Sequence, residues 1–132
     1  MDKDLPDLGD GYKLNIEDCE LFDLQNSDNN IIVDDIILDF TFDSVFIIVS
    51  QRPWNVPDIP GVEQMTYKEQ KEAFRKSTFV QYWIINKKEK CESITDTLGV
   101  HVRYSNVYGP FKSEEYLQKR EEIGVPAELK LK

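Results

Sequence analysis

Carboxylates are the side chains best placed to do chemistry in this sequence, and three of them recur along one short stretch. Asp35, Asp39 and Asp43 follow one another at intervals of four residues. Residues an even number apart lie on the same face of a strand, so this spacing predicts a shared acidic face. Such a face could bind a cation or a basic protein, or it could be the solvated side of the strand. A glycosidase also uses two carboxylates, but the abundance of acids here does not indicate one.

A tryptophan in a proline-rich stretch could complete this surface. Trp54 stands between Pro53 and Pro57, with Pro60 three residues further on. Prolines hold the backbone extended, and an aromatic side chain on a stiff loop makes a good interface anchor. We therefore predict a binding surface made of Asp35, Asp39, Asp43 and Trp54. The alternative for Trp54 is that it folds back to cover a sheet edge.

The residue sets of common catalytic and metal sites are missing from the sequence. His101 is the single histidine, and no GxSxG, phosphate-binding glycine loop or HExxH motif occurs. Cys19 and Cys91 form no CxxC or Cys/His cluster. The Asn/Asp-rich stretch 25–30 lacks the glycine and the distant glutamate of a calcium loop. We therefore predict a protein that is not an enzyme and that has no cofactor and no metal.

Charge is distributed unevenly along the 132 residues. Residues 1–60 hold fourteen acidic and three basic residues, a net charge of −11, whereas residues 61–132 carry a net charge of +2. An acidic surface repels the phosphates of nucleic acids and speeds the encounter with basic proteins. It also aids solubility without any partner. The charge pattern predicts a basic protein as the partner and argues against nucleic acid.

The expected location follows from hydropathy. No stretch approaches the roughly 18 apolar residues of a transmembrane helix, and residues 1–6 have no apolar signal core. We expect a cytoplasmic protein as the chain stands, or a cell-envelope protein if a signal or lipobox segment has been removed.

Two apolar runs predict the strands around which the chain folds. Residues 78–86 and 45–49 are rich in aromatic and β-branched side chains, which suit a sheet. Apolar residues fall on both faces, as expected for central strands of one sheet. The side chains that we expect to be largely buried are Phe46, Ile48, Trp83 and Ile85.

A third strand should be exposed on one side. Ile36, Leu38, Phe40 and Phe42 alternate with polar residues, with Ile37 the exception, which predicts an apolar face of period two. A turn at Asp43–Ser44 would join this strand to residues 45–49 in a hairpin.

Helix signals appear twice. The pair Thr66 and Glu69 is a capping box that predicts a helix over residues 67–76. A second helix should begin at Ser113 as its N-cap and run to Ile123, where Gly124 would end it with positive φ. Its predicted apolar stripe is Tyr116, Leu117 and Ile123.

These elements predict an α+β fold, mainly an antiparallel β-sheet with two short helices packed on it. Residues 1–10 are expected to be a flexible acidic lead-in, and residues 11–132 a single domain.

Three segments carry a resemblance to a known family: residues 82–87 (YWIINK), 107–111 (VYGPF) and 120–126 (REEIGVP). In this order they resemble a family of small bacterial proteins of unknown function, many of them envelope lipoproteins. The resemblance implies a non-enzymatic domain associated with the cell envelope, and it transfers no catalytic or binding residue. The alternative function is an immunity-type inhibitor that neutralises a basic bacterial toxin.

Overall fold

The computed structural model describes residues 8–17, 20–34, 36–53, 59–95 and 102–131 of the chain. The strands are β1 (Lys13–Glu17), β2 (Glu20–Gln25), β3 (Ile31–Val33), β4 (Ile37–Phe42), β5 (Phe46–Gln51), β6 (Gln81–Asn86), β7 (Ser93–Thr95), β8 (Val102–Tyr104) and β9 (Val107–Phe111). The helices are the 3-10 helix η1 (Val62–Gln64) and the α-helices α1 (Tyr67–Lys76) and α2 (Ser113–Ile123). The predicted α+β class with antiparallel sheets is confirmed.

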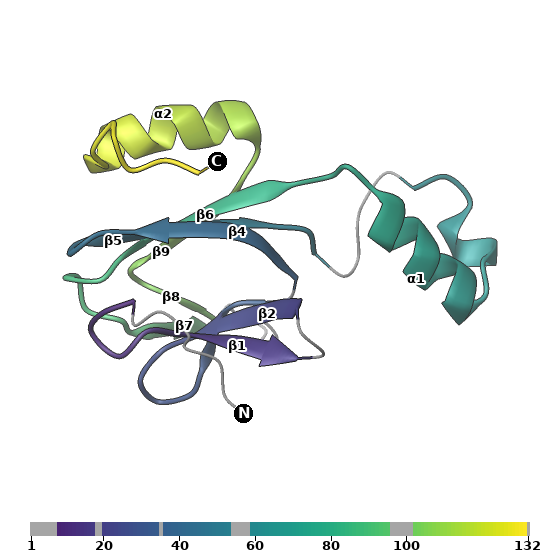
Figure 1. Cartoon of the computed structure of the whole chain (residues 1–132), viewed down its shortest axis with the longest axis horizontal. Helices are drawn as coiled ribbons and strands as arrows, with labels where there is room; N and C mark the ends of the chain where they lie inside the picture. The colour runs from purple at the N-terminus through teal and green to yellow at the C-terminus, as the bar shows by residue number, and fades with distance from the viewer. Residues whose placement is uncertain (1–7, 18–19, 35, 54–58, 96–101, 132) are drawn as a thin grey trace.

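Three layers build the body of the protein (Figure 1). The middle layer is an antiparallel sheet with the strand order β4-β5-β6-β9. The antiparallel sheet β1-β2-β3 covers one face of the middle layer, and α2 covers the other. Strands β7 and β8 form a separate ribbon in the connection from β6 to β9.

Strands β5 and β6 are central and buried on both faces, as their apolar runs predict. They pair with each other along their whole length, with Ile48 opposite Ile84. Adjacent residues of a strand point to opposite faces, so both strands contribute to two cores. The core under the β1-β2-β3 sheet receives Ile47, Val49 and Ile85. The core under α2 receives Phe46, Ile48 and Ile84.

Trp83 is less buried than expected. Phe46, Ile48 and Ile85 are buried as predicted, but Trp83 is only partly buried, at the margin of the core under the β1-β2-β3 sheet. Its Nε1 donates a hydrogen bond to Gln51 Oε1 at 2.6 Å. Because an indole N–H needs an acceptor when it leaves water, Trp83 lies where the apolar core meets a polar side chain.

The predicted apolar face of residues 36–42 is wrong in its first half. Phe40 and Phe42 pack against the core as expected, but Ile37 is buried while Ile36 and Leu38 are exposed. The register of β4 against β5 shifts between Ile37 and Asp39. A bulge adds one residue and so reverses which residues face inward on its two sides.

Helix α2 lies on β6 and β9 and is followed by a segment that buries Val125 and Leu129. Lys112, not Ser113, is the N-cap, and its backbone N–H donates to Glu115 Oε1 at 3.0 Å. Gly124 has a φ of 95°, which confirms the predicted left-handed stop. The predicted apolar stripe is wrong at Leu117, which is 56% exposed, because the helix instead buries Tyr116 and Arg120, four residues apart.

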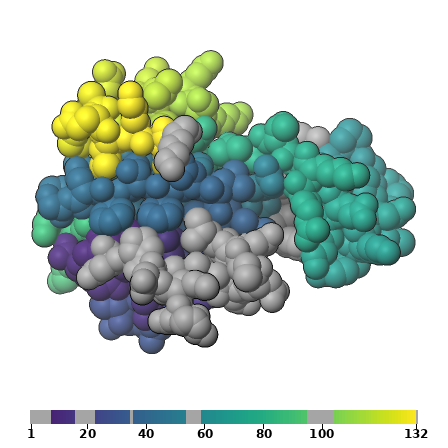
Figure 2. Space-filling view, in the orientation of Figure 1, coloured from purple at the N-terminus to yellow at the C-terminus, as the bar shows by residue number. Residues whose placement is uncertain are grey.

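Helix α1 lies on an arm that projects beyond the end of the middle sheet (Figures 1 and 2). Its boundaries are those predicted from the capping box. Thr66 Oγ1 accepts from the Glu69 N–H at 3.2 Å, and the Thr66 N–H donates to Glu69 Oε1 at 2.9 Å. These two bonds satisfy backbone donors that the helix itself leaves without partners.

The described end of the N-terminal segment is part of the core. Leu8 is fully buried under the middle sheet. The buried Lys87 Nζ donates to the carbonyl oxygens of both Leu8 and Asp43. This ammonium group therefore joins the N-terminal segment to the turn between β4 and β5.

Two glycines give a matched test of backbone strain and close packing. Gly109 and Gly124 have φ values of 140° and 95°. A Cβ on Gly109 would lie 2.8 Å from the Tyr82 carbonyl oxygen, whereas one on Gly124 would meet no atom within 4 Å. We predict that Gly124→Ala costs about 1 kcal/mol, from conformation alone, and Gly109→Ala about 2–4 kcal/mol, from conformation and contact. Urea unfolding of the two variants checks this, and equal losses would contradict the close approach of β9 to β6.

Candidate functional site

The structure describes two of the four residues of the predicted binding surface. Asp39 lies in β4 and Asp43 directly follows it. Both side chains are partly exposed. Asp35 and Trp54 lie outside the described residues, so their place on this surface stays a prediction.

Both described aspartates hold backbone N–H groups. Asp39 Oδ1 accepts from the Phe40 N–H at 2.9 Å. Asp43 Oδ1 accepts from the N–H groups of Val45 at 2.8 Å and Phe46 at 2.7 Å. Aspartate commonly closes turns in this way, so Asp43 shapes the β4–β5 turn in addition to carrying a charge.

The two aspartates share a face of an edge strand. Strand β4 stands at one end of the order β4-β5-β6-β9 in the part of the chain that the structure describes. Asp39 and Asp43 are four residues apart, past the bulge, so they lie on the face opposite Phe40 and Phe42. At the rise of a strand their Cα atoms are roughly 13 Å apart.

This spacing limits the chemistry that the two carboxylates can do together. One metal ion binds its oxygen ligands at about 2–2.6 Å, so two aspartates whose Cα atoms lie roughly 13 Å apart do not both reach a single ion. A separation of roughly 13 Å between their Cα atoms instead suits a partner with several spaced positive charges.

Asp34 extends the acidic surface and was not foreseen in the sequence. Asp34 is exposed and immediately precedes Asp35 in the sequence. Its backbone carbonyl oxygen accepts a hydrogen bond from Gln51 Nε2 at 2.9 Å. We call Asp34, Asp39 and Asp43 the acidic edge. The hydrogen bond from a buried β5 side chain holds the backbone at one end of the acidic edge against the sheet.

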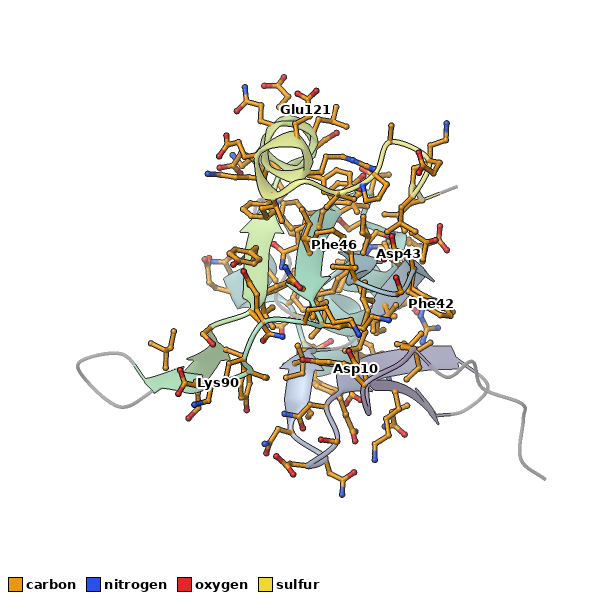
Figure 3. All side chains as sticks on the ribbon, turned by 90° about the vertical axis from the view of Figure 1, so that its left-hand side faces the viewer. Asp10, Phe42, Asp43, Phe46, Lys90 and Glu121 are labelled. Atoms are coloured by element: carbon orange, nitrogen blue, oxygen red, sulfur yellow. The ribbon has the colours of Figure 1, made fainter. Side chains whose placement is uncertain are left out.

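Other acids lie on different layers of the molecule. Figure 3 shows Asp43 and Phe42 at the level of the middle sheet, Asp10 on the side of the β1-β2-β3 sheet and Glu121 on α2. Asp10 forms an ion pair with Lys88 at 3.3 Å, with both side chains well exposed. An exposed pair of this kind adds little to stability, but it offsets the charge of Asp10.

Cys91 is a free, partly exposed thiol that packs against the core under the β1-β2-β3 sheet. Asn26 Nδ2 lies 3.9 Å from Cys91 Sγ. Tyr12 also neighbours the thiol, and its hydroxyl accepts from Asn106 Nδ2 at 2.7 Å. Neither an amide nor a neutral phenol is a general base near pH 7, so these neighbours do not make Cys91 an activated nucleophile. Cys19 and His101 lie outside the described residues.

Burial raises the pKa of the Tyr12 phenol to about 12. The hydrogen bond from Asn106 opposes this rise, and the nearby Cys91 adds to it. Asn106 is itself fully buried and also donates to the Asn86 carbonyl oxygen at 2.9 Å. Tyr12 therefore stays neutral at any physiological pH and ties the start of β1 to the β6 and β9 region.

Sequence reasoning missed the buried polar residues that this fold uses. Among them are Gln51, Lys87, Asn106 and Arg120. Each has a side chain that is usually exposed, so nothing in the local pattern indicated burial. Only Arg120 had a signal, since it stands four residues after Tyr116 and so shares a helix face with it.

Neither a metal cluster nor a membrane span appears in the described ranges. No group of three or more His, Cys, Asp or Glu side chains there could hold a metal ion. Neither helix of that part of the chain is long and apolar enough to cross a bilayer.

Comparison with known proteins gives one match. The family model described as "Protein of unknown function (DUF3997)" matches residues 11–132. No curated protein matches the chain, and neither does any solved structure.

The pKa of Tyr12 generates a prediction about stability in alkali. The phenol ionises near pH 10 in the unfolded chain and near 12 in the folded protein, so its contribution is complete below pH 10 and is lost as the pH rises toward 12. Between pH 8 and 11.5, the free energy of unfolding should fall by about 2 kcal/mol more in the unaltered protein than in the Tyr12→Phe variant. Urea unfolding at both pH values measures this.

Tyr67 supplies the control for this experiment. It is 69% exposed, so Tyr67→Phe should keep the full alkaline loss of the unaltered protein. Parallel pH dependences for Tyr12→Phe and the unaltered protein would contradict the burial of the Tyr12 hydroxyl.

Proposed function

The chain belongs to the DUF3997 family of proteins of unknown function, and we propose that it is a non-enzymatic binding domain whose acidic edge engages a basic protein. The observation that carries this proposal is the net charge of −11 on residues 1–60, part of which lies on the edge strand β4 and its flanks. The rest of the chain carries +2. An acidic surface attracts a basic partner over a distance and aligns it before contact.

The geometry of the acidic edge supports a protein as the partner. Asp39 and Asp43 each use Oδ1 for a backbone N–H, which fixes their position before a partner arrives. Groups that are already ordered lose less entropy on binding. Their wide spacing along β4 matches an extended basic surface better than a small cation.

Trp54 has a separate role in this proposal. A tryptophan on a proline-rich loop would supply the buried apolar contact that surface charges do not provide. The carboxylates would then set the rate of association, and Trp54 the rate of dissociation.

Two narrower settings are compatible with such a domain. The acidity of the chain favours an immunity-type inhibitor of a basic toxin, and the family resemblance favours an envelope-associated protein. Genomic neighbourhood separates the two, because an immunity gene follows the gene of its toxin. A lipobox encoded upstream of residue 1 would favour the envelope.

The experiment is a pull-down from the native cell, followed by surface plasmon resonance with the captured protein. The test variant is the pair Asp39→Asn and Asp43→Asn, because asparagine keeps the Oδ1 acceptor while removing the charge. We expect a basic protein whose association slows about three- to tenfold at low salt, with little change in dissociation. Raising the salt should shrink the difference, since the screening length falls to about 8 Å near 0.15 M.

A matched control removes the same number of charges elsewhere. Asp28 and Glu72 are exposed, on the β2–β3 loop and on α1, so Asp28→Asn with Glu72→Gln should change association less than about twofold. Capture of an acidic partner, or an equal effect of the two variant pairs, would overturn the proposal.

A further inference from the structure

A cavity of about 600 Å³ lies between α2 and the chain segment that follows it. One wall is the face of α2 that carries Ser113, Leu117 and Glu121. The other wall is formed by Ala127, Lys130 and Leu131, and Tyr82 of β6 also lines the cavity. The cavity is therefore elongated along two turns of α2, because Ser113 and Glu121 are eight residues apart on one helix.

A buried cation lines this cavity, and no acidic side chain of the described residues forms an ion pair with it. Arg120 lines the cavity and is only 9% exposed. Its guanidinium donates to Tyr116 Oη at 3.0 Å, to the Pro126 carbonyl oxygen at 2.7 Å and to the Leu129 carbonyl oxygen. The ion pairs of the described residues join other side chains, and none reaches Arg120.

Within the described residues, Arg120 has no ion pair, and some of its N–H groups form no hydrogen bond. Neutral carbonyl and hydroxyl dipoles surround it and its Cζ lies 5.6 Å from the centroid of the Tyr116 ring, whereas buried charges in proteins are usually paired with an opposite charge. Three hydrogen bonds use three of the five N–H groups that a guanidinium offers. A carboxylate entering the cavity would find an available cation, with the exposed Lys130 as a second one.

The rest of the lining is suited to an apolar body. The rings of Tyr82 and Tyr116 are stacked, with centroids 4.6 Å apart and planes inclined by 16°. Burial raises the pKa of Tyr116, so its ring stays neutral. Leu117 and Leu131 add aliphatic surface. Such a mixture of apolar walls and a few polar groups is typical of small-molecule sites.

We infer that this cavity binds a small monocarboxylic acid with an apolar body. The carboxylate pairs with Arg120 and Lys130, and the body lies against Tyr82, Tyr116 and Leu131. Glu121 lines the same cavity, and its negative charge disfavours a second carboxylate or a phosphate on the ligand. This site is independent of the acidic edge, so the inference does not rest on the proposed function.

Octanoate, octanamide and octanedioate are the probes, titrated into the isotope-labelled full chain and followed by NMR. Octanamide matches octanoate in shape but is neutral, and octanedioate adds a second charge. We expect saturable shifts of Leu117 and Leu131 methyl signals, with octanoate binding at least about tenfold more tightly than either analogue. Equal affinities for octanoate and octanamide, or shifts away from this cavity, would overturn the inference.

Variants of exposed residues test the site without disturbing the fold. Leu117→Glu places a negative charge on the cavity wall and should abolish octanoate binding, while Leu117→Gln should retain it. Lys130→Gln should lower the affinity for octanoate by about three- to fivefold, which is the contribution of one exposed ion pair. Lys119 is exposed on the same helix and does not line the cavity, so Lys119→Gln is the control and should leave affinity within about twofold. An effect of Lys119→Gln equal to that of Lys130→Gln would mean that only the overall charge matters, which contradicts a defined site.

Discussion

The burial of β5 and β6 on both faces is the constraint on which the rest of the structure depends. Each fully buried aliphatic side chain on these strands stabilises the fold by about 1.5–3 kcal/mol, provided that something covers it. Adjacent residues of a strand point to opposite faces of the sheet, so a covering layer is needed on each face. The β1-β2-β3 sheet supplies one, and α2 with the segment after it supplies the other. Three layers are the consequence.

Buried polar side chains hold the N-terminal segment and β1 to the middle sheet, and α2 to the segment that follows it. Lys87 binds the Leu8 and Asp43 carbonyl oxygens, Asn106 binds the Tyr12 hydroxyl, and Arg120 binds the Pro126 and Leu129 carbonyl oxygens. In the described part of the chain, the two buried cations are thus shown bound to backbone oxygens. Because hydrogen bonds are directional, such contacts fix the position of a cover more narrowly than apolar packing does.

The two surfaces proposed to bind partners differ in place and in chemistry. The acidic edge follows β4, at one edge of the middle sheet, and its carboxylates are spaced for an extended basic surface. The cavity lies on the layer above, beside α2, and combines one buried cation with aromatic and aliphatic walls. A charged edge acts at a distance and sets the rate of encounter, whereas a cavity with mainly apolar walls acts by contact. The two surfaces share no residue, so a macromolecular partner and a small ligand would bind them independently.

The sequence by itself determined the features that depend on near neighbours along the chain. The capping box at Thr66, the left-handed stop at Gly124 and the two-sided apolar runs of β5 and β6 are of this kind, and so is the shared face of Asp39 and Asp43. Only the tertiary structure decided the bulge that buries Ile37 in place of Leu38 and the burial of Lys87 and Asn106 against the N-terminal part of the chain. Those outcomes depend on which strand, turn or carbonyl group lies opposite each residue. Local propensity and periodicity contain no information about a partner that is distant in sequence.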